Sequence, residues 1–233
     1  MSINKGDGQS TKPKIRGKIC MVVHAHYPIG ETRVERQAKA LVAKDFEVDV
    51  ICVSGSNQSG YSIEEQVEIY RLPVRRKRGS KPIVHLLEYI TFLYLVFFKL
   101  SKLHFHKQYN LIQVHNLPDF LVFSTLIPKF SGTKIVLDIH DLMPEFYAER
   151  FQKSMKSTFV RIIAWQERLS CSYADHVITV TELWRQTLIK RGQPSNQVSV
   201  VMNLADRNIF EPRKSNIELD NKCFRLFYHG SMG

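Results

Sequence analysis

The stretch Lys134–Glu145 reads Lys-Ile-Val-Leu-Asp-Ile-His-Asp-Leu-Met-Pro-Glu, an apolar run that breaks abruptly into ionisable residues. Its β-branched start predicts a strand buried on both faces, as strands of parallel sheets are. Pro144 limits direct continuation of regular structure, so we expect His140, Asp141 and Glu145 on a loop just past the strand. Ligands of open α/β sheets bind at the carboxyl ends of the strands. The stretch therefore predicts a parallel sheet and the place of its site.

Two further predicted strands also end in imidazole side chains. One ends at His24-Ala25-His26 and the other at His115-Asn116. Because the carboxyl ends of parallel strands share one edge of a sheet, we expect the three histidine-bearing ends to converge on one cleft.

Strand and helix patterns alternate along the chain, which predicts an α/β fold: a Rossmann-like parallel sheet with helices on both faces. Residues 1–16 are expected to be a disordered tail, 17–210 the domain, 211–222 a linker, and 223–233 the first strand and turn of a second domain at which the chain is truncated. The predicted strands are 18–24, 46–53, 67–72, 111–115, 134–139, 176–180 and 198–202, and the predicted helices 31–44, 119–129, 153–173 and 182–190.

Most of the net charge of +11 lies in one segment. Between Arg71 and Lys107 there are nine basic residues and one acidic residue, Glu88, which leaves +8 of the total. Such local basicity indicates an anionic surface as a partner. The segment also holds the most apolar window, 83–100, in which the ten residues 89–98 include only Thr91 as a non-apolar residue.

Ten residues fall short of the ~20 that span a bilayer, so the window predicts a helix at the membrane interface. The alternative is a helix packed in the core with a solvated rim of charge. Nucleic acid is disfavoured because the aromatic side chains are clumped and not interleaved with the cations. The predicted membrane-docking residues are Arg75, Arg76, Lys77, Arg78, Phe97 and Phe98.

The four cysteines form no CxxC pair, and no signal peptide is visible before Lys18, so we expect reduced thiols and a cytoplasmic location. His24 and His26 with Asp138 and His140 could be metal ligands. The alternating pattern has too few strands for the barrel that usually carries such a site, so we expect no metal. A dinucleotide site would need G-x-G-x-x-G after the first strand, where only Gly30 is present.

The candidate site residues follow from the strand ends and from the first helix. Gly30 and Arg33 at a helix start suit an anion or a sugar, although Gly30 could equally be an ordinary turn glycine. Ionisable groups at strand ends can orient hydroxyls and shuttle protons, while Asp141 could instead cap the chain structurally. We predict His115, His140 and Asp141 as catalytic residues, and Gly30, Arg33, Asn116 and Glu145 as substrate-binding residues.

Several segments together resemble the N-terminal domain of glycosyltransferase family 4, which has the GT-B fold. The likeness covers about residues 17–233. The segments that carry it are Thr32–Leu41, Val114–Asp119, Asp138–Glu145, Ala174–Thr181 and the run from Asn203 through Asp206 to Phe210.

The resemblance implies transfer of a sugar from a nucleotide-sugar, with retention of configuration and without an obligatory metal or other cofactor. This domain would mainly bind the acceptor, with His115 and His140 facing the transferred sugar and Gly30 beside the acceptor or the donor phosphates. A second domain, of which Tyr228-His229-Gly230 resembles the first strand and turn, would supply most donor contacts. This chain alone is then expected to be inactive and to need that domain or a partner subunit.

Two functions from different classes follow. The first is the acceptor-binding half of a transferase that acts on a lipid-linked saccharide at the inner face of the plasma membrane. The second is a non-catalytic scaffold that docks a separate transferase on the membrane.

Overall fold

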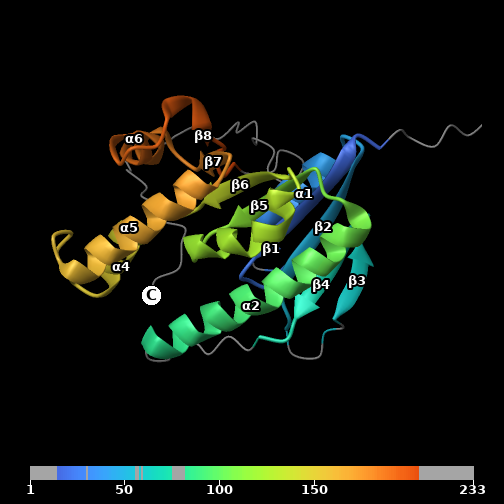
Figure 1. Cartoon of the computed structure of the whole chain (residues 1–233), viewed down its shortest axis with the longest axis horizontal. Coiled ribbons are helices and arrows are strands. Elements are labelled where there is room, and N and C mark those ends of the chain that lie inside the picture. Colours follow the sequence, from blue (N-terminus) through green and yellow to red (C-terminus); the bar gives the residue numbers. More distant parts are fainter. Residues whose placement is uncertain (1–14, 30, 56–57, 59, 75–81, 205–233) are drawn as a thin grey trace, which may run out of the picture. The chain divides into compact units, whose positions relative to one another are not determined.

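The computed structural model describes residues 15–29, 31–55, 58, 60–74 and 82–204 of the chain. Its centre is an eight-stranded sheet in the order β3-β4-β2-β1-β5-β6-β7-β8 (Figure 1). Every neighbouring pair is parallel except β3 and β4, which are antiparallel. The strands are β1 (Gly17–Val23), β2 (Phe46–Val53), β3 (Tyr61–Glu64), β4 (Val67–Leu72), β5 (Leu111–His115), β6 (Lys134–Ile139), β7 (His176–Thr179) and β8 (Val198–Val200).

Alternate residues of the central strands feed two separate cores, one on each face of the sheet. Helix α1 (Thr32–Val42) covers one face, where Val34 and Ala38 pack with Met21 and Val50. The other core holds Val22 and Val114, which have the opposite pleat, together with side chains of four further helical elements. These elements are α2 (Pro82–Lys107), the 3-10 helix η1 (Asp119–Thr125), α5 (Thr158–Tyr173) and α6 (Glu182–Lys190).

The short elements complete the connections. They are α3 (Leu126–Phe130), α4 (Met143–Arg150) and the 3-10 helix η2 (Ser195–Gln197). The predicted parallel sheet with helices on both faces is confirmed, and β3 is its one antiparallel addition. The strand β3 escaped prediction because a four-residue edge strand with only one half-buried side chain carries little hydrophobic signal.

Two expectations about helices were wrong. Pro144 does not keep Glu145 on a loop: it occupies the first turn of α4, where its missing N–H costs nothing, and Glu145 lies in that same turn. The helix predicted over 119–129 is a 3-10 helix followed by five α-helical residues, with Pro128 in the second piece.

Helix α2 is much longer than the ten apolar residues suggested. The segment Val84–Lys107 has the length and mean hydropathy of a membrane-crossing helix, and 22% of its most apolar window is buried in the domain. Phe92, Val96 and Leu100 are fully buried against the sheet, so one side of α2 is part of the domain core. The predicted docking residues Arg75 to Arg78, and likewise Gly30 and all residues assigned to the linker and second domain, lie outside the described residues.

Candidate functional site

The strand order places the ends of β1, β5 and β6 side by side. Val23 pairs with His115, and His115 in turn pairs with Asp138, one step before β6 ends. His140 follows two residues later and therefore points to the same face as Asp138. The sheet thus brings two of the predicted histidines to one place at the carboxyl ends of its strands.

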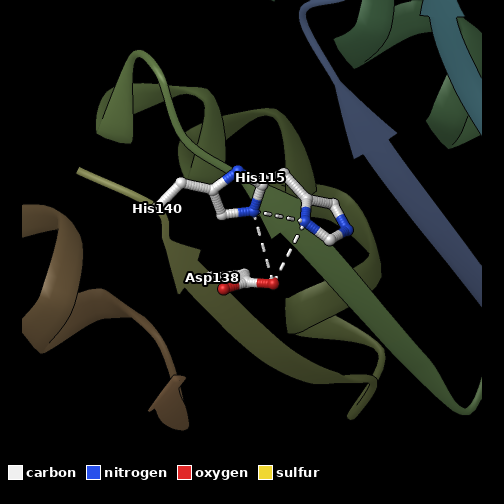
Figure 2. A group of neighbouring side chains, drawn as sticks. All are labelled: His115, Asp138 and His140. Atoms are coloured by element: carbon white, nitrogen blue, oxygen red, sulfur yellow. Dashed lines mark hydrogen bonds and ion pairs between the residues drawn. The ribbon is translucent and has the colours of Figure 1, made fainter. Parts of the chain in front are cut away.

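Three atoms form a triangle at this edge (Figure 2). Asp138 Oδ2 lies 3.2 Å from His115 Nδ1 and 3.5 Å from His140 Nε2. The two ring nitrogens lie 3.1 Å apart. Because a carboxylate can only accept, Asp138 favours a proton on a ring nitrogen that faces it. When that proton sits on His140 Nε2, the other nitrogen of His140 presents a lone pair.

Asp138 is the centre of a larger set of donors. Arg33 of α1 donates from Nη2 to Oδ1 at 2.8 Å and from Nε to Oδ2 at 3.0 Å. The amides of Gln37 and Gln113 each donate to Oδ2 at 3.1 Å. Arg33 Nη1 also donates to the carbonyl of Val201 at 2.6 Å, just after β8. The pair of Asp138 and Arg33 therefore joins α1, β5, β6 and the chain beyond β8.

The charges at this centre are fixed by its surroundings. Burial alone would raise the pKa of Asp138, but its hydrogen bonds with His115, His140 and Arg33 hold it well below the usual range. Burial lowers the pKa of His115, against the opposing effect of Asp138, so His115 is neutral at pH 7. The centre is an ionised aspartate paired with an arginine and flanked by imidazoles.

His140 is the member of the triangle that reaches the surface. Its side chain is 16% exposed, whereas those of His115 and Asp138 are fully buried. Within the described part of the chain, His140 Nδ1 makes no hydrogen bond. His140 is therefore the member of the triangle that is open to solvent, and its role toward a substrate stays a prediction.

Asn116 holds the backbone of the loop that carries His140. Its Oδ1 accepts from the N–H of His140 at 2.7 Å, and its Nδ2 donates to the carbonyl of Asp141 at 2.6 Å. Nδ2 also donates to Asp119 Oδ1 at 2.9 Å. Asn116 is thus satisfied by protein groups on both ends, an arrangement that positions His140.

A second buried carboxyl group, Asp119, lies behind Asn116. Asp119 is fully buried, and its Oδ2 has no hydrogen-bond partner among the described residues. Burial and the nearby Glu167 raise its pKa to about 8, although Asn116 acts in the opposite direction. Burial likewise raises the pKa of Glu167 to about 7, against the opposing charge of Arg191, which donates to it at 2.6 Å.

The remaining predicted residues lie around this centre with distinct partners. Asp141 is half-buried, and burial raises the pKa of its carboxyl group. Glu145 is exposed and forms an ion pair with Arg191. Their assigned roles, like those of His115, His140, Asn116 and Arg33, stay predictions.

His24 does not join the other two histidines as expected. Its Nε2 lies 3.3 Å from Glu88 of α2, and its ring meets Tyr89 and Phe92 edge-on. The pleat explains the difference, because the end of β1 turns His24 towards α2 while His115 faces the α1 side. Only two of the three histidine-bearing strand ends therefore share a cluster.

His115, Asp138 and His140 offer ligand atoms within 4.8 Å of one another, the one such group found in the described ranges. A cation there would meet the guanidinium of Arg33, 2.8 Å from Asp138, and two amide donors that already fill Oδ2. The donor set fits a hydrogen-bonded cluster and does not fit a divalent ion. His24 and His26 are not members of the group.

Sequence reasoning considered Asp138 only as a metal ligand and missed Gln37, Gln113, Asp119 and Glu167. Some signal was present: Gln113 precedes His115 by two residues, as Asp138 precedes His140, so each pair shares one face of its strand. Arg33 and Gln37 are likewise four residues apart on one helix face. Glu167 had no such signal, because its burial depends on how α5 packs.

The family model described as "Glycosyl transferase 4-like domain" matches residues 30–203. Chitobiosyldiphosphodolichol beta-mannosyltransferase of Debaryomyces hansenii is 27% identical over 183 residues, which are 76% of this chain and 38% of that protein. The chain therefore spans well under half the length of this relative.

Solved structures of the same fold agree. Sucrose-phosphate synthase of Thermosynechococcus elongatus matches with a TM-score of 0.64 and 16% identity over 84% of this chain and 50% of that one. HepE of Anabaena, in complex with UDP and glucose, matches with a TM-score of 0.52 and 17% identity over 83% and 46%. Because the family model covers most of the chain, including the site, and the solved structures share its fold, the chain belongs to the glycosyl transferase 4-like family and has the N-terminal domain of a GT-B glycosyltransferase.

Proposed function

We propose that this chain is the acceptor-side half of an enzyme that transfers a sugar from a nucleotide-sugar to a lipid-linked saccharide, with retention of configuration and no metal. The observation that carries the proposal is the match of the family model over residues 30–203, which contain the whole Asp138 centre. The name of the yeast relative supports a lipid-linked acceptor, and the Anabaena structure supports a nucleotide-sugar donor.

In this proposal His140 is the group that contacts the substrate. Asp138 and His115 fix its ring, and Asn116 fixes its backbone, so its outer nitrogen is held where an acceptor hydroxyl or the transferred sugar is placed. Asp138 is ionised, but it is enclosed by Arg33 and two amides and so cannot act as a nucleophile. Retention of the anomeric configuration then requires the phosphate of the donor to assist the sugar transfer, and the second domain completes the site.

The test measures transfer of labelled sugar from a set of nucleotide-sugars to lipid extract of the source organism, using the complete protein. His140→Ala is expected to reduce transfer roughly 100-fold or more. His176→Ala is the matched control, because His176 is the first residue of β7 and so lies at the amino ends of the parallel strands, away from the site. Equal activity of both variants would refute the role of His140 and favour the scaffold function instead.

The anomeric configuration of the product separates two roles for His140. Retention, seen by NMR as the same configuration in donor and product, leaves His140 as a positioning group. Inversion would overturn the retaining proposal and make the lone pair of His140 the general base that deprotonates the acceptor hydroxyl.

We also propose that the enzyme works at the cytoplasmic side of the plasma membrane, held there by α2. Leu87, Ile90, Tyr94, Phe98 and Phe105 recur at helical spacing and are between 47% and 70% exposed. Their stripe lies opposite the buried Phe92 and Val96. In the sequence it is preceded by the predicted docking cations at 75–78. Phe98 is thus part of the outer stripe, whereas Phe97 is half-buried. An exposed apolar stripe with basic flanks suits anionic lipid.

A further inference from the structure

Helix α5 has an outer face of the same kind as α2, although nothing in its sequence pattern singled it out. Ile162, Trp165 and Leu169 are 60%, 63% and 41% exposed and follow one another at intervals of three and four residues. The opposite side of α5 is buried through Val160, Glu167 and Cys171. The apolar stripe is therefore not needed for the core.

The charge around this stripe is strongly positive. Arg161 and Arg168 are exposed and flank it on α5 itself. Within residues 150–169 the one carboxylate, Glu167, is buried and bonded to Arg191. The other exposed basic side chains of this segment are Arg150, Lys153 and Lys156.

The two apolar stripes belong to one side of the molecule. Both α2 and α5 contact η1, and both feed the core on the face of the sheet opposite α1 (Figure 1). Each helix turns its stripe away from that core. Both stripes therefore face away from the same side of the sheet.

We propose that Ile162, Trp165 and Leu169 of α5 form a second contact with an anionic lipid bilayer and, with α2, fix the orientation of the domain on it. The inference extends the membrane association proposed above. Charge complementarity selects the partner, because acidic headgroups attract Arg161 and Arg168 while the apolar stripe enters the headgroup boundary. The exposed tryptophan fits that boundary, where indole rings are enriched.

The chain has two tryptophans, so Trp184→Phe leaves Trp165 as the single reporter. In this variant we expect the Trp165 emission to shift to shorter wavelength with vesicles that contain phosphatidylglycerol. Bromine atoms placed near the headgroup end of the lipid chains are expected to quench it. Vesicles of phosphatidylcholine alone should leave it unchanged. Binding to acidic vesicles without any change in Trp165 emission would show that α2 docks alone and would overturn the proposal.

Charge variants test the partner. Arg161→Ser with Arg168→Ser is expected to weaken binding to acidic vesicles roughly 30-fold, which is about fivefold per cation. Lys39→Ser with Lys44→Ser removes the same charge from the α1 side and is the matched control. Equal weakening by both pairs would reduce the effect to net charge and overturn the α5 contact.

A blue shift of Trp165 that depends on protein concentration and needs no lipid would identify a second copy as the occupant, and it too would overturn the proposal. These measurements involve no sugar and no nucleotide. Failure of the transfer assay therefore leaves them intact, and failure here leaves the transferase proposal intact.

Discussion

The two buried aspartates at neighbouring strand ends solve the same electrostatic problem in opposite ways. Asp138 sits among Arg33, two amides and two imidazoles, and its pKa is held well below the usual range. Asp119 has one amide donor, no ion pair in the described segments, and a pKa of about 8. Burial disfavours charge at both, so the supply of donors decides which aspartate ionises.

The difference assigns different tasks to the two groups. Asp138 is a permanent charge that fixes Arg33 and the imidazoles. Asp119 is neutral at pH 7 and keeps Asn116 in place through a hydrogen bond between uncharged groups. Variants can therefore separate the aspartate that must be charged from the one that must not.

The largest expected effect is that of Asp138→Ala. It leaves the guanidinium of Arg33 buried without its carboxylate, which typically lowers the free energy of unfolding by about 3–5 kcal/mol. Urea unfolding at pH 7 measures it. The control is Glu47→Ala, whose exposed ion pair with Lys18 should change stability by less than about 1 kcal/mol. Similar losses from both variants would contradict the central role of Asp138.

Acid sensitivity extends this prediction. The pKa of Asp138 is lower in the folded than in the unfolded chain, so its stabilisation is present above the unfolded value near 3.9 and is lost as the pH falls below it. We expect the stability of the wild-type protein to fall more steeply on acidification than that of Asp138→Asn, as followed by circular dichroism. Parallel acid curves would contradict the assignment.

Asp119→Asn should behave in the opposite sense. Because the folded pKa of Asp119 is raised to about 8, the folded state holds a proton that the unfolded state has released between pH 4 and pH 8. Over that range this group costs at most about 1.4 kcal/mol per pH unit. We expect Asp119→Asn to gain stability relative to the wild-type protein as the pH rises from 5 to 8. Asp119→Ala, which loses the acceptor for Asn116, should be less stable than Asp119→Asn at every pH.

A smaller effect is expected from Asn116→Ala. The N–H of His140 and the carbonyl of Asp141 lose their partner, at a cost of about 1–3 kcal/mol. Hydrogen exchange should accelerate at the His140 amide and stay unchanged at the amides of β2, such as Val50. Acceleration throughout the sheet would instead indicate a general loss of stability.

The smallest effect is a shift in a titration. Glu167 contributes to the raised pKa of Asp119, so Glu167→Gln should lower the pKa of Asp119. Carboxyl carbon NMR follows the titration of Asp119 in the wild-type protein and in the variant, and an unchanged titration would show that Glu167 does not contribute to the raised pKa of Asp119.

The positions of strands and helices followed well from periodicity, because a buried parallel strand such as β6 is a short apolar run with a polar end. The helix at 182–190 was predicted with its observed bounds, since Thr181 caps it and Gly192 follows it. The long-range part of the site was not predictable in the same way. That Arg33 meets Asp138, 105 residues away, depends on β1 and β6 lying on either side of β5, which no local pattern encodes.

The charge state of each carboxyl group also could not be predicted from the local sequence. Asp138 and Asp119 both follow apolar residues or a proline and look alike in the sequence. Their opposite charge states arise from donors on α1 and β5 in one case, and from burial beside Glu167 without an ion pair in the other. Such differences arise only once distant elements have packed.

The central place of β1 has a consequence for synthesis on the ribosome. Its partner β2 follows soon after it, but its other partner β5 begins about 90 residues later in the chain, which takes roughly 4–18 s at typical elongation rates. During that interval the edge of β1 that later pairs with β5 is open, and the apolar α2 has no completed sheet to cover. A nascent chain in this state is a natural client for a chaperone at the exit tunnel, and slowed elongation between β2 and β5 would lengthen its exposure to aggregation.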